Sequence, residues 1–193
     1  MYVTDLQHFL DMPPDAPGPA RRLAEHLSAI VRAATAGDAR IAWESALPCR
    51  RRPANRRCPG RLIVHRGEPG SPIDWRCSAC GDDGVISSWE ESHFDLRRRR
   101  PALVGTLHQI VVPHEVAAAL RELCLLETEL ERLVFGIRVH GGDAILTVTD
   151  EQLDDLIDAM AAEANHETNR RRRQRLDAAY DALDAAAGSA DRR

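Results

Sequence analysis

Residues 49–81 carry four of the chain's five cysteines in two arms, the first reading CRRRPANRRCPG (residues 49–60) and the second CSACG (residues 77–81). Apolar runs bounded by glycine and proline turns lie between and after these arms. Such runs predict short β-strands, at residues 62–65, 73–77 and 85–89. Because this region has few large apolar side chains, it can bury little surface by itself, and the cysteines are expected to hold it together.

The spacing of these cysteines predicts one metal site. Cys77 and Cys80 share a tight turn that presents two thiolates to one ion, and Gly81 allows the backbone amides to turn toward the sulfurs. In the other arm, eight residues separate Cys49 from Cys58, where two to four are usual. The 18 residues between Cys58 and Cys77 suit a pair of strands.

Four thiolates in a tetrahedron select zinc or iron, and the long first spacer favours zinc over a rubredoxin-like iron site. A site closed by four cysteines has no open position for water, so the predicted Zn²⁺ is structural. Two alternatives stay open at this point. One uses three of the cysteines with a histidine such as His65, and the other leaves the thiols without metal.

The segment from Cys49 to Trp89 resembles zinc ribbons, through CPG in one arm and CSACG in the other. Zinc ribbons serve transcription factors, ribosomal proteins, nucleases and scaffolds, so this resemblance implies a module and no particular activity. The whole chain also resembles uncharacterised proteins of high-GC, actinobacterial bacteria, in the stretches SPIDWRCSACGDDGVISSWE and EANHETNRRRRQRLDAAYDAL.

The predicted fold class is α+β, in three parts. Residues 1–37 are expected to form an N-terminal helical arm, with a capping box at Thr4 and Gln7 and a helix over about 20–36 that ends at Gly37. Residues 38–100 form the zinc-ribbon-like β module. Residues 101–193 form an α+β domain that ends in long helices.

The third part is expected to run strand, helix, hairpin, helix. Its predicted elements are a strand within 103–112, a helix from about Pro113, a hairpin of 133–139 with 144–148, a helix capped by Thr149, and a break near 166–169 before the last helix. Cys124 lies on the apolar face predicted for the helix after Pro113. We therefore expect it to be a small buried side chain.

Charge is distributed unevenly along the chain. The net charge is -4, and all 26 basic residues are arginine. Residues 49–100 hold 12 arginines and 7 acidic residues, whereas residues 101–193 hold 10 and 17. The arginine-rich metal module is therefore a candidate for binding nucleic acid or an acidic protein surface. The candidate residues are Arg50, Arg51, Arg52, Arg56, Arg57 and Arg61, with Trp75 and Trp89 as stacking faces.

Other interpretations remain. The tryptophans could instead cover the small core, with the arginines solvated or paired with the acidic C-terminal half. The protein would then be an adaptor that binds other proteins through its C-terminal helices, with zinc purely structural. An enzyme of unrecognised class is the third hypothesis, although His114-Glu115 lacks the second histidine of a metalloprotease motif, because residue 118 is alanine.

No apolar run is long enough to span a membrane, so we expect a cytoplasmic location without membrane partners. The oligomeric state is not predicted.

Overall fold

The computed structural model describes residues 1–13, 15–98, 105–124 and 126–190. It has two compact units, Met1–Arg98 and Arg99–Arg193, which are described separately. Strands and helices occur in both units, so the expectation of an α+β fold is confirmed. The boundaries predicted for the three parts of the chain stay predictions.

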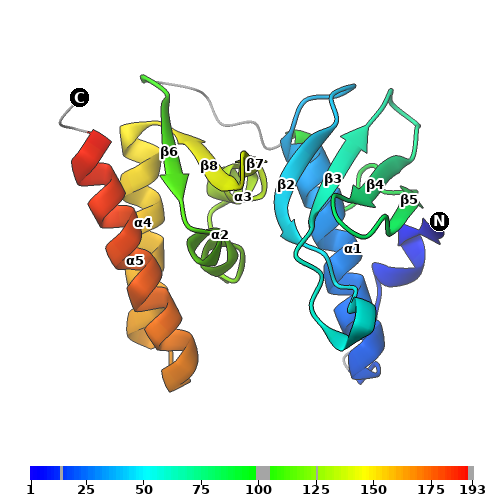
Figure 1. The fold of residues 1–193 in the computed structure, drawn as a ribbon, viewed down its shortest axis with the longest axis horizontal. Coiled ribbons are helices and arrows are strands. Elements are labelled where there is room, and N and C mark those ends of the chain that lie inside the picture. The colour runs from blue at the N-terminus through cyan, green and yellow to red at the C-terminus, as the bar shows by residue number, and fades with distance from the viewer. Residues whose placement is uncertain (14, 99–104, 125, 191–193) are drawn as a thin grey trace. The chain divides into compact units, whose positions relative to one another are not determined.

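The first unit contains a five-stranded mixed sheet (Figure 1). Its strands in spatial order are β1 (Tyr2–Asp5), β5 (Asp83–Ser87), β4 (Ile73–Cys77), β3 (Arg61–Arg66) and β2 (Trp43–Pro48). β1 runs parallel to β5, and the other neighbours are antiparallel. The strand predicted at 73–77 is therefore confirmed, whereas the one predicted at 85–89 begins two residues earlier.

Helix α1 (Gly18–Ala36) packs against β2, β3 and β4. Its apolar side chains recur every three or four residues, which places Leu27, Ile30 and Val31 on one buried face. Alternate residues of a strand point to the same face of the sheet, and in β3 the buried ones include Leu62 and Val64. The helix and the sheet thus share one hydrophobic core.

The expectation of an N-terminal helical arm is wrong. Residues 2–5 form strand β1, and its register pairs Val3 with Val85. The following turn, Leu6–Phe9, is a 3₁₀ helix capped by Asp5, whose carboxylate accepts a hydrogen bond from the amide of Gln7 at 3.0 Å. Thr4 is instead a buried strand residue. Tyr2, Val3 and Thr4 favour strands, but the partner of β1 lies about 80 residues away, so the short segment alone does not predict the pairing.

The second unit contains a three-stranded antiparallel sheet in the order β6 (His108–Val112), β8 (Asp143–Val148), β7 (Arg138–His140). Two short helices, α2 (His114–Arg121) and α3 (Thr128–Phe135), connect β6 to β7. The predicted glycine turn between the hairpin strands is confirmed, because Gly141 and Gly142 have φ of 61° and 96°.

Two details of this unit correct the sequence expectations. Residues 133–135, predicted as the start of a strand, form the end of α3, so the hairpin strand is short. Cys124 is exposed, because α2 ends at Arg121 and the helical face predicted to bury it does not extend that far.

Helices α4 (Asp150–His166) and α5 (Arg170–Ala190) pack against each other. The predicted capping box is confirmed, with Thr149 and Gln152 exchanging hydrogen bonds at the start of α4. The predicted break at 166–169 separates the two helices.

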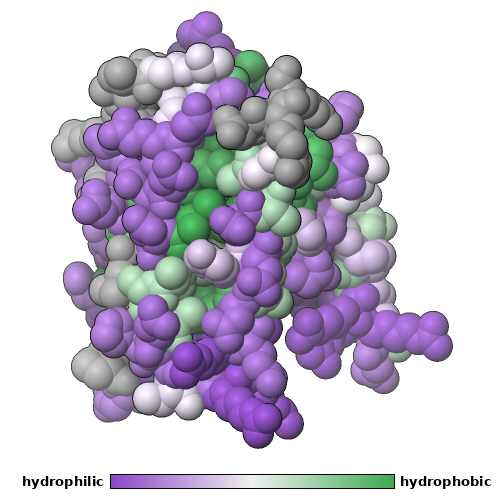
Figure 2. Space-filling view, turned by 90° about the vertical axis from the view of Figure 1, so that its left-hand side faces the viewer, coloured by the Kyte–Doolittle hydropathy of each residue, from purple (hydrophilic) through white to green (hydrophobic). Residues whose placement is uncertain are grey.

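Hydrophilic side chains predominate on the face seen in Figure 2, with a smaller apolar area between them. Among the described residues, no helix combines the length and the apolar character that crossing a bilayer would require.

Candidate metal centre

The sheet of the first unit brings the four predicted cysteines together. Cys49 follows β2, Cys58 precedes β3, Cys77 ends β4, and Cys80 lies in the turn to β5. Because these strands are antiparallel neighbours, all four positions fall at the same end of the sheet. The four Sγ atoms all lie within 4.8 Å of one another. The predicted group therefore forms a cluster that can hold a metal ion, in which Cys49, Cys58 and Cys77 are buried and Cys80 is exposed.

Within the cluster the sulfurs form two close pairs. The Sγ atoms of Cys49 and Cys80 are 3.7 Å apart, and those of Cys58 and Cys77 are 3.6 Å apart. These separations exceed a disulfide bond of about 2.05 Å, and all four residues are free cysteines. They suit four sulfurs arranged around one ion with metal–sulfur bonds of about 2.3 Å.

Backbone amides point at the sulfurs of both arms. The amides of Arg51 and Gly60 donate to Sγ of Cys49 and Cys58, each at 3.4 Å. In the other arm, the amides of Ala79 and Cys80 donate to Sγ of Cys77 at 3.4 and 3.5 Å. Such donors stabilise thiolates, the form in which cysteine binds metals.

Further backbone hydrogen bonds close the first arm and connect it to the second. Within the first arm, the amide of Cys49 donates to the carbonyl of Gly60 at 2.9 Å. Between the arms, the amide of Ser78 donates to the carbonyl of Arg61, the residue after Gly60, at 2.9 Å. The amide of Arg61 in turn donates to the hydroxyl of Ser78 at 3.0 Å. The predicted site residue Arg61 therefore joins the two arms through its main chain.

Glycine is required at position 60 for this approach. A Cβ on Gly60 would lie 2.5 Å from Sγ of Cys77 and 2.8 Å from Cβ of Ala79. Gly81, which the sequence singled out, has φ of 69°, the left-handed region that glycine adopts most readily. The CPG motif contained the signal for Gly60, but its steric role depends on a strand pairing that the sequence does not specify.

The surroundings of the cluster shift the pKa values of its thiols in opposite directions. Burial raises the pKa of the Cys49 thiol, and the neighbouring sulfurs raise it further. Burial also opposes ionisation of Cys77, but the amide donors of Cys80 and Ala79 lower its pKa to about 7. A bound cation would favour the thiolate form of all four.

His65 does not join the cluster. Its Nδ1 lies 3.3 Å from a carboxylate oxygen of Asp74, its cross-strand neighbour on β4. Among the described residues, the cluster of possible metal ligands contains the four cysteines. The arrangement therefore matches the four-cysteine interpretation more closely than the alternative that included His65.

The residues between the first two cysteines form an ordered loop, called here the arginine loop (residues 50–57). Its backbone is closed by hydrogen bonds from the amides of Cys58 and Asn55 to the carbonyls of Arg51 and Arg52, at 3.0 and 3.1 Å. At its tip Ala54 and Asn55 have φ of 50° and 62°, which is uncommon for residues other than glycine. The loop therefore has a defined conformation.

The arginine side chains differ in their surroundings. Arg50 donates to the carbonyl of Arg22 in α1 at 2.7 Å, and Arg51 lies 3.5 Å from a carboxylate oxygen of Asp82. The other three arginines of the loop are exposed, and within the described part of the chain their side chains have no hydrogen-bond or ion-pair partner. These three are Arg52, Arg56 and Arg57.

Both predicted stacking residues are core residues. Trp75 is 7% exposed and meets the ring of His26 edge to face, with 6.0 Å between the ring centroids. Trp89 is 1% exposed, and its indole nitrogen donates to the carbonyl of Ser71 at 3.0 Å. Neither ring is available to a base, so the structure does not support a stacking role for these tryptophans.

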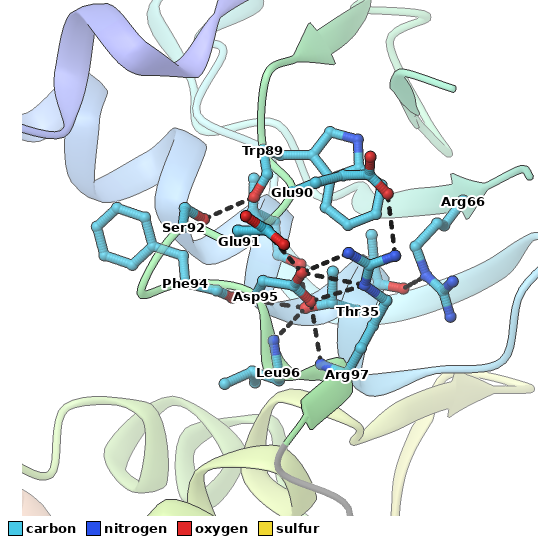
Figure 3. A network of polar contacts seen from close by, with 12 residues as sticks. Thr35, Arg66, Trp89, Glu90, Glu91, Ser92, Phe94, Asp95, Leu96 and Arg97 are labelled. Atoms are coloured by element: carbon cyan, nitrogen blue, oxygen red, sulfur yellow. Dashed lines mark hydrogen bonds and ion pairs between the residues drawn. The ribbon is translucent and has the colours of Figure 1, made fainter. Parts of the chain in front are cut away.

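A polar network holds the end of the first unit around Trp89 (Figure 3). Arg97 lies over the indole ring, with 4.5 Å from its guanidinium carbon to the ring centroid. The same guanidinium binds the carboxylates of Asp95 and Glu90, at 2.7 and 3.0 Å. The amide of Leu96 donates to the hydroxyl of Thr35 in α1 at 3.0 Å, which fastens this segment to the helix. Of the arginine run 97–100, residues 99 and 100 lie outside the described residues.

Comparison of this chain with protein-family models, with curated proteins and with solved structures finds no match. The resemblance to a zinc ribbon therefore rests on the sequence of the two cysteine arms.

Proposed function

We propose that the four cysteines bind one structural zinc ion, and that the arginine loop which they anchor binds the phosphate groups of a nucleic acid. Zinc suits the cluster because four sulfur donors close a tetrahedral site and leave no position for water or substrate. The eight-residue spacing of the first arm differs from the paired tight arms of a rubredoxin-like iron site. A zinc-ribbon-like module is consistent with both features.

The observation that carries the second part is the set of free guanidinium groups. Arg52, Arg56 and Arg57 are exposed and unpaired among the described residues, and they extend from a loop whose two ends are the metal cysteines Cys49 and Cys58. A loop that is ordered before binding loses less conformational entropy when it meets its partner. Guanidinium groups bind phosphate oxygens through paired hydrogen bonds.

A second basic element adjoins the loop. The hydrogen bond from Arg50 to the carbonyl of Arg22 places the loop beside the first turns of α1, where Arg21 and Arg22 are also exposed (Figure 1). The proposed surface thus combines residues from two elements. Because the two tryptophans are buried, we expect it to contact the sugar-phosphate backbone with little dependence on base sequence.

Fluorescence anisotropy tests this proposal with labelled single- and double-stranded DNA and RNA of about 20 nucleotides. The affinity of the full, zinc-loaded chain should fall steeply with salt. The triple variant Arg52→Glu/Arg56→Glu/Arg57→Glu should bind more weakly, with a salt slope smaller by about 2 to 3.

A matched control reverses the same number of charges elsewhere. Arg170→Glu/Arg171→Glu/Arg173→Glu alters exposed residues at the start of α5 and should leave affinity nearly unchanged. Zinc content measured for both variants confirms that the metal site is intact. No binding to any nucleic acid at low salt would overturn the proposal. Binding to an acidic polypeptide in its place would assign the loop to a protein partner.

A further inference from the structure

Cys80 differs from the other three cysteines of the cluster in its access to solvent. Cys49, Cys58 and Cys77 are at most 8% exposed, whereas Cys80 is an exposed residue. A cavity of about 460 Å³ opens beside it and is lined by Cys80, Gly81, Arg51 and Arg52 among others. A small reactant can therefore reach one sulfur of the cluster directly.

This exposed residue also has a partner sulfur nearby. Sγ of Cys49 lies 3.7 Å away, and Cys49 is buried in the cluster. The two residues come from different arms, since Cys49 follows β2 and Cys80 lies in the turn before β5. A bond between them would remove one ligand from each arm.

We propose that Cys80 is an oxidation site, at which a hydroperoxide converts Cys80 and Cys49 into a disulfide and releases the metal. The inference rests on the metal site proposed above. The thiolate of Cys80 attacks one oxygen of hydrogen peroxide, the O–O bond breaks, and hydroxide leaves, which produces a sulfenic acid on Cys80. The thiolate of Cys49 then attacks that sulfur and displaces a second hydroxide.

The electrons and atoms balance in these two steps. Two electrons pass from the two thiolates to the peroxide, which becomes two hydroxide ions, and one S–S bond forms. Cys58 and Cys77 would then be the remaining thiolate ligands, too few to retain a bound metal ion. Cys58 and Cys77 stay reduced, so a thiol reductant with added zinc restores the original site.

Release of the metal would act on the arginine loop, because Cys49 and Cys58 are its two ends. Oxidation leaves Cys49 tied to Cys80 and frees Cys58 from the metal. The loop then keeps its charges and loses one of its anchors. Binding through the arginine loop should therefore weaken on oxidation.

The test uses the full zinc-loaded chain with Cys124→Ser, which removes the exposed cysteine outside the cluster. Hydrogen peroxide is added, zinc release is followed with a chromogenic indicator, and the disulfide is mapped by mass spectrometry of peptides. We expect one zinc ion released for each Cys49–Cys80 disulfide. A disulfide that joins a different pair of cysteines, or zinc release with Cys80 unmodified, would overturn the proposal.

Two histidine variants separate accessibility from ligand loss. Cys80→His keeps four ligands and removes the reactive sulfur. Peroxide should therefore release zinc from this variant at least about tenfold more slowly than from the parent. Cys58→His makes the same exchange at a buried position and should retain the rate of the parent. Equal rates in the two variants contradict the role of Cys80.

A measurement on the unmodified sequence covers the case in which a variant fails to fold. Limited alkylation with iodoacetamide should modify Cys80 before the other cluster cysteines, with exposed Cys124 as the internal reference. A protein that holds no zinc but still forms the Cys49–Cys80 disulfide would refute the proposed metal and retain the oxidation site. Alkylation of Cys58 or Cys77 ahead of Cys80 would refute the oxidation site alone.

Discussion

Gly60 lies so close to the sulfur of Cys77 that a Cβ at position 60 would be 2.5 Å from that Sγ. The two residues belong to different arms of the cluster, and this contact sets how closely the arms approach. The obstacle to a larger residue is the sulfur of Cys77 and the adjacent Ala79, neither of which is a long flexible side chain that could turn away. A methyl group at position 60 would therefore separate the arms.

The substitution Gly60→Ala should lower both zinc affinity and the stability of the first unit, by about 1 to 3 kcal/mol in the free energy of unfolding. Competition with a metal indicator measures the affinity, and urea unfolding measures the stability. Gly67→Ala is the matched control, because its Cβ would meet the nearest atom, Cβ of Ser71, at 3.4 Å. A variant at position 60 that matches this control on both measurements would show that the arms have room to adjust.

The pair Asp95–Arg97 predicts a pH-dependent contribution to stability. Although burial opposes ionisation of Asp95, the side chain and amide of Arg97 hold its pKa below the ordinary value. A carboxylate with a lowered pKa stabilises the folded state at pH values above its unfolded pKa of about 3.9. That contribution is lost as the pH falls through the lower folded pKa.

We expect Asp95→Asn to destabilise the first unit by about 2 to 4 kcal/mol at pH 7. The difference from the parent protein should shrink below about pH 4. Urea unfolding across a pH series measures this dependence. Glu68→Gln, which removes an exposed ion pair with Arg40, should cost less than about 0.5 kcal/mol. A constant difference for Asp95→Asn down to low pH would mean that its carboxylate is not the stabilising group.

Arg172 connects the helices α4 and α5 of the second unit. Its guanidinium binds Glu163 and Glu167 and donates to the carbonyl of Glu122 at 2.8 Å. Burial opposes the ionisation of Glu163, but the hydrogen bonds from Arg172 and from the amide of Cys124 lower its pKa.

Arg172→Ala should therefore destabilise the second unit by about 2 to 4 kcal/mol, because it leaves the buried Glu163 carboxylate without its cation. The exposed neighbour provides the control, with Arg171→Ala expected to change stability by less than about 0.5 kcal/mol. Thermal unfolding followed by circular dichroism compares them. Equal effects of the two substitutions would mean that the pairing with Glu163 contributes nothing particular.

Removing the metal should unfold one part of the chain selectively. Structural zinc supplies a large share of the folding free energy of small modules, and the four ligands all lie in the first unit. With a strong chelator, hydrogen exchange should accelerate in β2 to β5 and stay unchanged in the second unit. Acceleration across both units alike, or in neither, is inconsistent with a local structural role.

The sequence predicts the four-cysteine segment well, because the signals for it are local. The spacing of Cys77 and Cys80, and the strand at 73–77 that leads into them, follow from turn residues and alternating apolar positions. The break between α4 and α5 is local in the same sense, as is the capping box at Thr149. Each of these features depends on residues only a few positions apart.

The features that sequence reasoning missed depend on distant parts of the chain. Strand β1 pairs with β5, with Val3 opposite Val85, and although Tyr2, Val3 and Thr4 favour strands, four residues are too short a run to predict this pairing. Gly60 matters because Cys77 lies beside it across a strand pairing. The tryptophans are buried through contacts with His26 and Ser71, which are distant in the sequence from Trp75 and Trp89. Periodicity within one element does not encode such pairings.

Native mass spectrometry of the purified full chain, with elemental analysis of the same sample, tests the central claim most directly. If Cys49, Cys58, Cys77 and Cys80 bind one structural zinc ion, the chain should carry one zinc, and Cys77→Ser should lose it together with the folded first unit. Cys124→Ser, outside the cluster, should retain the ion. A chain that is folded without metal, or that carries a different metal, would contradict the claim.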